Sequence, residues 1–409
     1  MSKIQKIRGF QDIYGENAKK YRKIIDTARK IFDKYNFEEI ILPFIEDISL
    51  FKRSVGEATD IVQKEMYIFE DKGGRAIALR PEGTASVVRA YIEEGMYAKG
   101  GYKKLFYEGA MFRYERPQAG RYRQFHQIGA EIFGVDTVVA DAELIKMVKE
   151  ILDELKIEVR LEINSLGSFE DRKEYIRQLK KFLESKKENL CETCQTRIET
   201  NPLRVLDCKV KQCKEETKIA PLITNYLSEK SLERYTKLKE YLKALGIQFT
   251  ENPRLVRGLD YYTDTVFEFI TDKIGAQAAV AAGGRYDKLV SQLGGPETPA
   301  LGFAAGVERL MLLVEGLPEG KPLTVVIPVV SDYNIRALKS SNLLRSKDIK
   351  TETLLKEGSL KSKMKLANKL NAKFVIFVSD KYELKYMDTG EQEIFENIED
   401  LVDVLNEKI

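Results

Sequence analysis

The sequence predicts an α+β protein of two or three domains, on three observations. First, 409 residues are too many for one hydrophobic core. Second, residues 104–114 and 124–134 alternate like half-buried strands on either side of a loop from Glu115 to Arg121, which predicts an antiparallel hairpin. Third, strands alternate with helices after a linker rich in Pro and Gly, residues 316–322, which predicts a small parallel or mixed three-layer domain.

Composition and charge limit the classes of function. The chain is 43% hydrophobic and 32% charged, as in ordinary globular proteins, and its net charge is only +3. No global field attracts a polyanion, so a surface that binds RNA would have to be a local patch. The N-terminal residues lack the apolar core of a signal peptide, and no segment has the length of a membrane helix. We therefore expect a cytoplasmic protein without a membrane partner.

The first elements are predicted from apolar spacing. Residues 17–36 carry apolar side chains at helical intervals and predict an amphipathic helix. Residues 37–47 are rich in strand-forming residues, and Pro43 indicates an edge or a special junction. Residues 138–155 predict a second helix, which packs on a strand at 159–167.

Residues 168–229 are rich in lysine and predict a helical insertion between strands of the larger domain. All four cysteines lie there, as C-x2-C and C-x4-C pairs thirteen residues apart: Cys191, Cys194, Cys208 and Cys213. Paired cysteines of this kind outline a structural zinc site. The alternative is four reduced thiols, because a disulfide is disfavoured in a reducing compartment.

The C-terminal segment predicts elements in strict alternation. Strands are expected at 323–330, 350–355 and 373–379, helices at 334–346, 360–370 and 398–407, and turns between 380 and 397. No G-x-G-x-x-G sequence opens this segment, which disfavours a dinucleotide site. One end is basic through six lysines: Lys356, Lys361, Lys363, Lys365, Lys369 and Lys373. Taken alone, such a run is typical of a solvated face.

The most informative stretch is FRYERPQAGRYRQFHQIGAE, residues 112–131. It places Arg113, Arg116, Arg121 and Arg123 among aromatic side chains. Planar, permanently charged guanidiniums beside flat rings suit a site that binds phosphate or carboxylate and stacks an aromatic ring. The stretch therefore predicts an anion-binding loop on a hairpin.

Three motifs resemble those of one enzyme family. Residues 112–131 resemble motif 2 of class II aminoacyl-tRNA synthetases, specifically of histidyl-tRNA synthetases. LVRGLDYYTDTVFE (residues 255–268) resembles the histidine-specific signature of that family. AAGGRYDKL (281–289) and GFAAGVERL (302–310) resemble its second signature and its motif 3, although Ala282 stands where the family usually has glycine. The resemblance covers nearly the whole chain.

The resemblance implies both architecture and partners. Residues 1–320 would form a class II catalytic domain with an antiparallel sheet and the helical insertion at about 168–229. Residues 323–409 would form a small α/β anticodon-binding domain, which turns the lysine-rich end into a surface for tRNA. Motif 1, at residues 37–47, would build a homodimer interface. The implied partners are L-histidine, ATP with Mg²⁺ and tRNA(His).

The implied activity is a histidine–tRNA ligase, which joins histidine to the α-phosphate of ATP and then transfers it to tRNA. Such chemistry depends on positioning and electrostatics, so arginines rather than nucleophiles are expected. By resemblance, Arg113, Arg257 and Arg309 are catalytic. Arg113 bridges the α-phosphate and the histidine carboxylate, Arg309 reaches the γ-phosphate, and Arg257 stands where related enzymes place a metal ion. ATP would also be held by Glu115, Arg121 and Phe125.

Histidine recognition requires an acceptor and a donor for the two ring nitrogens. The resemblance gives these roles to Glu131 and Tyr262, with Tyr261 beside them. The amino group would meet Glu82, Thr84 and Gln127, and Arg113 and Arg257 would contact the carboxylate side. Gly283, Gly284 and Arg285 would form the floor of the pocket.

Other classes of protein fit the sequence less well. The single histidine, His126, leaves little material for a Ser-His-Asp or Cys-His hydrolase, and no P-loop sequence is present. By period-two alternation, His126 should face away from Phe125 and Gln127. One alternative is a regulatory paralogue of ATP phosphoribosyltransferase in histidine biosynthesis, but such paralogues lack the C-terminal domain. A nucleic-acid-binding module without catalysis is disfavoured by the near-neutral net charge.

Overall fold

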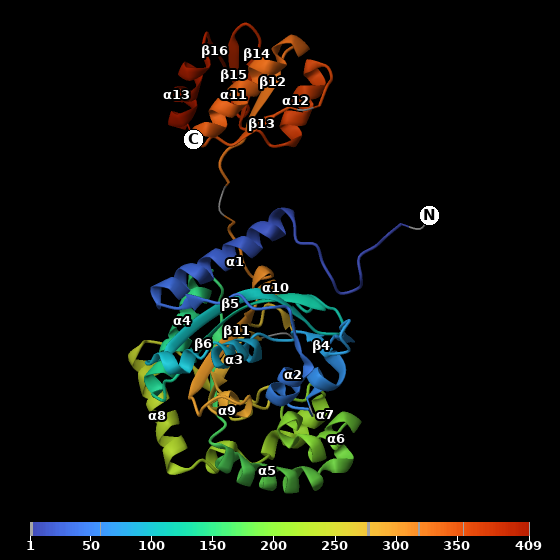
Figure 1. Ribbon diagram of the computed structural model, residues 1–409, viewed down its shortest axis with the longest axis vertical. Helices are drawn as coiled ribbons and strands as arrows, with labels where there is room; N and C mark the ends of the chain where they lie inside the picture. Colours follow the sequence, from blue (N-terminus) through green and yellow to red (C-terminus); the bar gives the residue numbers. More distant parts are fainter. Residues whose placement is uncertain (1–2, 58, 276–278, 318–319, 355, 409) are drawn as a thin grey trace. The chain divides into compact units, whose positions relative to one another are not determined.

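The computed structural model describes residues 3–57, 59–275, 279–317, 320–354 and 356–408 (Figure 1). Contacts divide the chain into two compact units, Met1–Leu317 and Pro318–Ile409. Pro318 and Glu319 of the predicted linker, and Leu355 of the predicted strand 350–355, lie outside the described residues. In the part of the chain that is described, no helix is long and apolar enough to cross a membrane.

The first unit is built on an eight-stranded sheet with the order β1-β5-β6-β11-β10-β9-β7-β8. The six central strands pair antiparallel, and the two-residue edge strands β1 and β8 pair parallel with their neighbours. The strands are β1 (Glu38–Glu39), β5 (Lys103–Phe112), β6 (Gln124–Phe133), β7 (Arg160–Ser165), β8 (Thr250–Glu251), β9 (Thr263–Ile270), β10 (Ala279–Arg285) and β11 (Ala300–Gly306).

Helices cover both faces of this sheet because the strands alternate apolar side chains between them. On one face, Phe106 and Ile128 pack with α1 (Gly15–Lys34), α4 (Val138–Glu154) and α8 (Glu229–Ala244). On the other, Leu105 and Tyr107 pack with α3 (Thr84–Glu93), α5 (Phe169–Glu184) and α6 (Glu192–Thr200). The helices predicted at 17–36 and 138–155 are therefore confirmed within two residues.

The segment around Pro43 leaves the main sheet and starts a second one. After β1 the chain enters β2 (Ile45–Asp47), which joins β4 (Ala76–Leu79) and β3 (Ile68–Glu70) in the order β2-β4-β3. Pro43 thus marks the junction between two short strands, as its missing N–H predicts. The other elements here are α2 (Ile48–Val55), the π-helical turn η1 (Ile61–Glu65) and the 3₁₀ turn η2 (Met96–Lys99).

The predicted insertion is helical and follows β7. It contains α5, whose N-cap Ser168 forms a capping box with Asp171, and then α6, η4 (Pro202–Val205) and α7 (Lys211–Glu216). Three further 3₁₀ turns are η3 (Lys187–Asn189), η5 (Thr217–Ile219) and η6 (Ile223–Asn225). The unit closes with α9 (Leu289–Gln292) and α10 (Val307–Met311).

The second unit is a five-stranded mixed sheet with the order β13-β12-β14-β15-β16. The strands are β12 (Thr324–Pro328), β13 (Thr351–Thr353), β14 (Phe374–Val378), β15 (Tyr382–Tyr386) and β16 (Gln392–Phe395). Helices α11 (Asn334–Ser346) and α13 (Ile398–Lys408) cover one face and α12 (Leu360–Lys369) the other, which confirms three layers. The prediction of turns alone between 380 and 397 is wrong, because β15 and β16 lie there.

Candidate active site

The β5–β6 hairpin places the arginine-rich stretch at the edge of a cavity. Its strands pair in register from Lys103 with Phe133 to Phe112 with Gln124, and the connecting loop contains a Gln118–Arg121 bridge. Along β6 the side chains alternate: Phe125 and Gln127 line the cavity, whereas His126 packs edge-on against Tyr21 of α1. The alternation expected for His126 is therefore observed.

The cavity has a volume of about 230 Å³ and is lined by four segments distant in sequence. They are residues 82–84 at the start of α3, the hairpin with its loop, loop 255–262 with β9 and β10, and the β11–α10 junction. The structure brings together every residue predicted for catalysis or for binding histidine and ATP except Glu131, whereas Gly283, Gly284 and Arg285, the predicted floor, do not line the cavity. The residues brought together are Glu82, Thr84, Arg113, Glu115, Arg121, Phe125, Gln127, Arg257, Tyr261, Tyr262 and Arg309.

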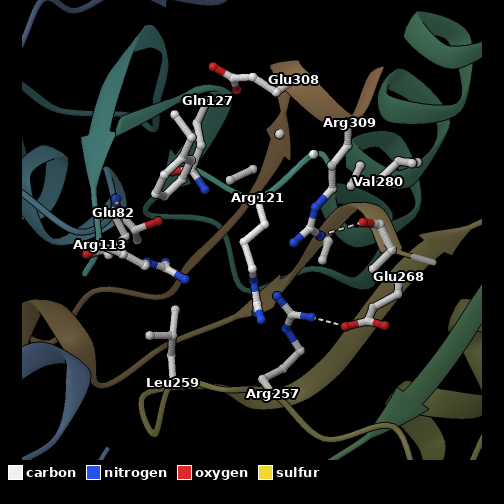
Figure 2. A pocket seen from close by; sticks show the side chains of 18 of the residues that line it. Glu82, Arg113, Arg121, Gln127, Arg257, Leu259, Glu268, Val280, Glu308 and Arg309 are labelled. Carbon is white, nitrogen blue, oxygen red and sulfur yellow. Dashed lines mark hydrogen bonds and ion pairs between the residues drawn. The ribbon is translucent and has the colours of Figure 1, made fainter. Parts of the chain in front are cut away.

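Guanidiniums dominate one side of the cavity (Figure 2). Arg121 and Arg257 point toward each other in its middle, with Arg309 beside them. Each arginine is anchored by a neighbour: Arg257 pairs with Glu268, and Arg309 Nη1 donates to the carbonyl of Ala279 at 2.7 Å. These anchors fix positive charge at the cavity surface before any anion arrives.

Arg113 and Arg121 are held from the hairpin side. Arg113 Nε donates to the carbonyl of Pro81 at 2.8 Å, and its guanidinium lies 5.4 Å from the Phe125 ring centroid. Arg121 pairs with Glu115. Burial lowers the pKa of Arg309, and the like charges of Arg121 and Arg113 lower it further. The cluster therefore carries unfavourable repulsion that a bound anion would relieve.

The opposite side of the cavity offers a carboxylate. Glu82 accepts hydrogen bonds from the backbone N–H groups of Thr84 at 2.7 Å and Ala85 at 2.8 Å, at the start of α3. Burial raises the pKa of Glu82, although these N–H groups and Arg113 favour its charged form. Nearby, Gln127 Oε1 is buried without a hydrogen-bond partner among the described residues. A buried acceptor of this kind indicates an absent ligand that donates.

Glu131 lies beneath this side rather than on the cavity wall, since its exposed fraction is 0%. Its carboxylate accepts a hydrogen bond from Thr84 Oγ1 at 2.7 Å and another from the Tyr286 hydroxyl. Gly302 of β11 faces it so closely that a Cβ there would lie 1.6 Å from Glu131 Oε2. Burial raises the pKa of Glu131 from 4.5 to about 8.

Two carboxylates of the cavity were not predicted from the sequence. Glu268 holds Arg257, and Glu308 accepts hydrogen bonds from the backbone N–H of His126 at 2.8 Å while its other oxygen lies 2.7 Å from His126 Nδ1. Glu308 thereby joins motif 3 to the hairpin. A carboxylate directly before Arg309 in an apolar segment was the available signal.

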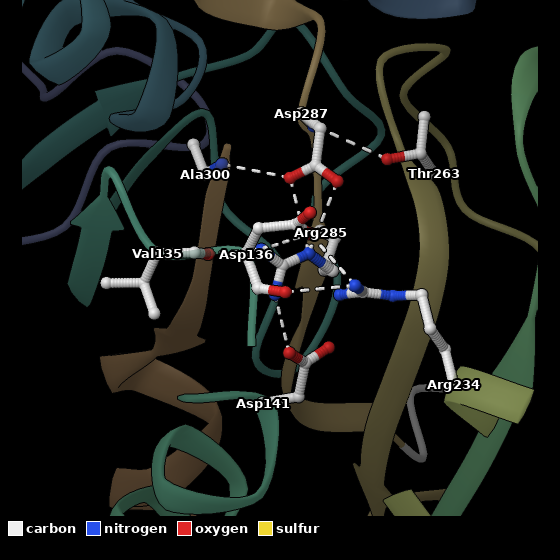
Figure 3. A network of polar contacts seen from close by, with 8 residues as sticks. All are labelled: Val135, Asp136, Asp141, Arg234, Thr263, Arg285, Asp287 and Ala300. Atoms are coloured by element: carbon white, nitrogen blue, oxygen red, sulfur yellow. Dashed lines mark hydrogen bonds and ion pairs between the residues drawn. The ribbon is translucent and has the colours of Figure 1, made fainter. Parts of the chain in front are cut away.

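The expectation that Arg285 forms the pocket floor is wrong. Arg285 is fully buried and turned away from the cavity, in a network with Asp141 at 2.6 Å, Asp287 at 3.2 Å and the carbonyl of Val135 (Figure 3). Arg285 pairs with Leu301 of β11 in regular register and projects from the same face of β10 as Gly283, toward α4. The lining residues of β10 are instead at 279–282.

The four cysteines of the insertion, named here the cysteine cluster, converge outside the cavity. Their sulfur atoms all lie within 4.8 Å of one another, and Cys191 Sγ is 4.0 Å from Cys208 Sγ. In a tetrahedral zinc site the sulfurs stand about 3.8 Å apart, because each Zn–S bond is about 2.3 Å. The backbone N–H of Cys191 donates to Cys213 Sγ at 3.2 Å, which favours a thiolate. This donor set fits a zinc ion.

Comparison with known proteins decides the family. A sequence model described as "Histidyl-tRNA synthetase" matches residues 9–310, and one described as "Anticodon binding domain" matches residues 324–408. The chain belongs to the histidyl-tRNA synthetase family. Its activity is therefore that of a histidine–tRNA ligase, a class II aminoacyl-tRNA synthetase, and ATP is its nucleotide.

Individual relatives agree with the family match over the full length. The histidine–tRNA ligase of Aquifex aeolicus is 55% identical over 95% of this chain and 98% of its own. That of Thermodesulfovibrio yellowstonii is 50% identical over 92% and 91%. The crystal structure of apo Staphylococcus aureus histidyl-tRNA synthetase has a TM-score of 0.81 at 38% identity and covers 98% of this chain and 99% of that one.

Proposed function

We propose that the cavity is where this synthetase activates histidine and that the arrangement of its charges assigns the residues. The observation that carries the proposal is that the guanidiniums of Arg121, Arg257 and Arg309 gather on one side of the cavity, while Glu82, with Arg113 beside it, lies on the other. In the first step a histidine carboxylate oxygen attacks the α-phosphorus of ATP, and pyrophosphate leaves. In the second, the 3′-terminal hydroxyl of tRNA(His) attacks the acyl carbon, and AMP leaves.

The cationic side fits the polyphosphate. Arg113 and Arg257 are proposed to flank the α-phosphate and the histidine carboxylate, which otherwise repel each other. Arg309 and Arg121 are proposed to hold the terminal phosphates of ATP, which enters as its magnesium complex. Guanidiniums fixed by neighbours stabilise the charge that develops on the phosphate without reorganising during the reaction. Arg257 supplies this charge without a metal ion in its position.

The nucleobase is proposed to stack on Phe125. Phe125 lines the cavity, and its ring centroid lies 5.4 Å from the guanidinium of Arg113, the residue proposed to hold the α-phosphate. Glu115 lies beside it as an acceptor for the exocyclic amine of adenine. Its pairing with Arg121 keeps the carboxylate in place.

The carboxylate side fits the histidine substrate. Its ammonium is proposed to meet Glu82, Thr84 and the unsatisfied Gln127 Oε1. The rings of Tyr261 and Tyr262 lie 4.8 Å apart between centroids, tilted by 39°, and are proposed to line the site of the substrate imidazole. We propose that Glu131 provides the acceptor for an N–H group of the substrate imidazole. It does so either directly or by orienting the hydroxyl groups of Thr84 and Tyr286. A dedicated polar site of this kind rejects amino acids that lack the matching donor.

A homodimer is proposed from an exposed apolar patch. Ile41, Phe44 and Ile45 are 87%, 52% and 46% exposed, in the segment that resembles motif 1. Ile68 and Phe69, at 50% and 42%, extend this patch on the adjoining three-stranded sheet. Large apolar side chains gathered on a surface indicate a protein interface. Sedimentation of the wild type against Ile41→Glu tests it: a dimer that persists unchanged in the variant contradicts this interface.

Three further assignments accompany the site. We propose that the cysteine cluster holds one structural zinc ion, which takes no part in either chemical step. We propose a cytoplasmic location, where histidine, ATP and tRNA meet. The second unit is proposed to bind the anticodon stem-loop, as its match to that domain family suggests.

The decisive experiment is ATP–pyrophosphate exchange with each of the twenty amino acids, on the wild type and on Arg257→Ala. Exchange with histidine alone is expected, and it should fall at least about a hundredfold in the variant, the scale of losing one fixed charge at a developing anion. Arg177→Ala, an exposed arginine of α5, is the control and should keep wild-type rates. If Arg257→Ala keeps the wild-type rate of pyrophosphate exchange, Arg257 is not one of the catalytic residues.

The regulatory paralogue of ATP phosphoribosyltransferase, the alternative considered from the sequence, is disfavoured by the family match and by the full-length relatives. A Bacillus halodurans protein described as an ATP phosphoribosyltransferase regulatory subunit/histidyl-tRNA synthetase shares the fold, with a TM-score of 0.66 at 22% identity. This chain matches the anticodon-binding domain family over its second unit and has all three predicted catalytic arginines in its cavity. If pyrophosphate exchange is absent with every amino acid, the result would favour the regulatory paralogue.

A further inference from the structure

The two cysteine pairs bracket one segment of the insertion. Cys191 is the N-cap of α6, Cys194 lies in its first turn, and Cys208 follows η4. Cys213, in α7, completes the cluster. A metal ion bound by all four would therefore tie the two ends of segment 191–208 together.

Between those ends lie the polar side chains through which the segment contacts the catalytic part of the unit. Asn201, the C-cap of α6, donates from Nδ2 to Asp260 Oδ1 at 2.8 Å. Arg197 Nη2 donates to Asp60 Oδ2 at 2.8 Å, just before η1. Of these two partners, Asp260 belongs to loop 255–262, which lines the cavity, whereas Asp60 does not line it.

The nearest part of the cavity is loop 255–262, which carries Arg257, Tyr261 and Tyr262. A Cβ on Gly258 of this loop would lie 2.7 Å from Arg204 Nη1, so segment 191–208 approaches the loop backbone directly. Gly258 admits that approach because it has no side chain.

The loop has a second support from the insertion. Arg172 of α5 donates to the backbone carbonyl of Asp260 at 3.3 Å and to that of Tyr262. Below these polar contacts, Cys194, Cys208, Cys213, Tyr261 and Tyr262 belong to one buried apolar cluster. The cysteine cluster and loop 255–262 therefore both pack into the same buried apolar cluster.

Thiols alone would hold this segment weakly. A cysteine without metal behaves as a small apolar side chain with a weak S–H donor. Metal binding, by contrast, adds directly to the free energy of folding of the segment that it closes. Ile198, Val205 and Leu206 already bury segment 191–208 in the apolar cluster, so bound zinc would add to this packing and fix the position of the segment against loop 255–262 more tightly.

We propose that the zinc-bound cysteine cluster positions loop 255–262 through Asn201 and Arg204 and thereby sets the affinity for histidine. This inference rests on the zinc site and on the histidine assignment proposed above. Asn201 and Arg204 act as positioning residues. Loss of zinc should weaken histidine binding while the phosphate-binding hairpin, which the segment does not touch through these contacts, keeps its geometry.

The test compares wild type before and after zinc removal with Asn201→Ala and with the matched control Asn397→Ala. Asn397 Nδ2 also donates to a carboxylate, Asp400 Oδ2 at 2.8 Å, and both residues belong to the second unit. Cys208→Ser supplies a zinc-deficient form if chelation is slow. Four quantities are measured: zinc per chain, the KM values for histidine and ATP, kcat in pyrophosphate exchange, and hydrogen exchange of backbone amides in loop 255–262.

The expected result is a kcat/KM for histidine that falls on the order of 100-fold on zinc removal, because displacement of positioned groups by about 1 Å costs this much. Both kcat and the histidine KM should change, because loop 255–262 carries Arg257 as well as Tyr261 and Tyr262. The ATP KM should change less, because Arg121 and Phe125 belong to the hairpin. Loop amides should exchange faster, and added zinc should reverse these effects in wild type. Asn201→Ala should show the same loss with zinc still bound, and Asn397→Ala no change.

The measurements distinguish which part of the proposal is wrong. If zinc-free wild type has an unchanged histidine KM and unchanged hydrogen exchange in loop 255–262, the coupling between zinc and the loop is refuted. The zinc site itself is not contradicted by that result. Purified protein without zinc, together with an unaffected Asn201→Ala, refutes both. Absence of histidine-dependent exchange in every form refutes the assigned chemistry instead, because the zinc content and hydrogen exchange are still readable.

Discussion

Replacement of Glu131 by Gln should change how the stability of the protein depends on pH. Glu131 is fully buried, and its carboxylate accepts hydrogen bonds from the hydroxyls of Thr84 and Tyr286. A glutamine amide is nearly isosteric and keeps one acceptor, while both hydroxyls can rotate to accept from its NH₂ group. The substitution therefore removes a titrating group with little change in packing.

The sign follows from the pKa of Glu131, which burial raises from 4.5 to about 8. Between these values the native protein keeps a proton that the unfolded chain has released. The free energy of unfolding of the wild type therefore falls as pH rises through this window and becomes flat above about pH 8. At about 1.4 kcal/mol per pH unit, the loss from this group is about 3 kcal/mol between pH 5 and pH 8.

Urea unfolding followed by circular dichroism at pH 5, 6, 7 and 8 measures this difference. Glu131→Gln should gain about 3 kcal/mol relative to wild type across the range. Glu188→Gln, at an exposed position in η3, is the matched control and should follow the wild-type curve. A difference between Glu131→Gln and wild type that is independent of pH would refute the reasoning, since Glu131 would then be ionised in the folded protein.

Three other substitutions test separate parts of the site. Gly302→Ala should abolish histidine-dependent exchange, because its Cβ would meet Glu131 Oε2 at 1.6 Å; Gly320→Ala, where a Cβ would meet no atom within 4 Å, should be tolerated. Arg285→Ala should lower the free energy of unfolding by about 3–5 kcal/mol, measured in urea, because it leaves buried carboxylates without their cation. His126→Asn should keep exchange within about fivefold, because His126 faces away from the cavity; a thousandfold loss would contradict this.

The hairpin and most of the site follow from local sequence. Period-two alternation predicts which residues of β6 face the cavity, and a dense run of arginines beside aromatic rings predicts what the cavity binds. Roles within the site, by contrast, came from resemblance to a family. Spacing alone could not bring Arg257 and Arg113 to opposite sides of one cavity.

The errors have physical causes that are visible only in three dimensions. The resemblance implied that Arg285 lies in the pocket floor, but its side chain projects from the opposite face of β10 to Gly284 and pairs with Asp141 of α4. The sequence did not predict β15 and β16 as strands. The residues of β16 are largely exposed and polar, so their hydropathy pattern resembles that of a turn. Glu308 was missed because its partner, the N–H of His126, is brought to it by tertiary pairing of β6 with β11.

His126 is also the only histidine in 409 residues. Each new copy of the chain therefore passes a single histidine codon during its translation, and consumes one molecule of the charged tRNA that the finished enzyme produces. When that charged tRNA is scarce, ribosomes making this protein can pause at one position, whereas those making histidine-rich proteins pause at many. The near-absence of its own substrate from its sequence makes the synthesis of the enzyme comparatively insensitive to shortage of its product.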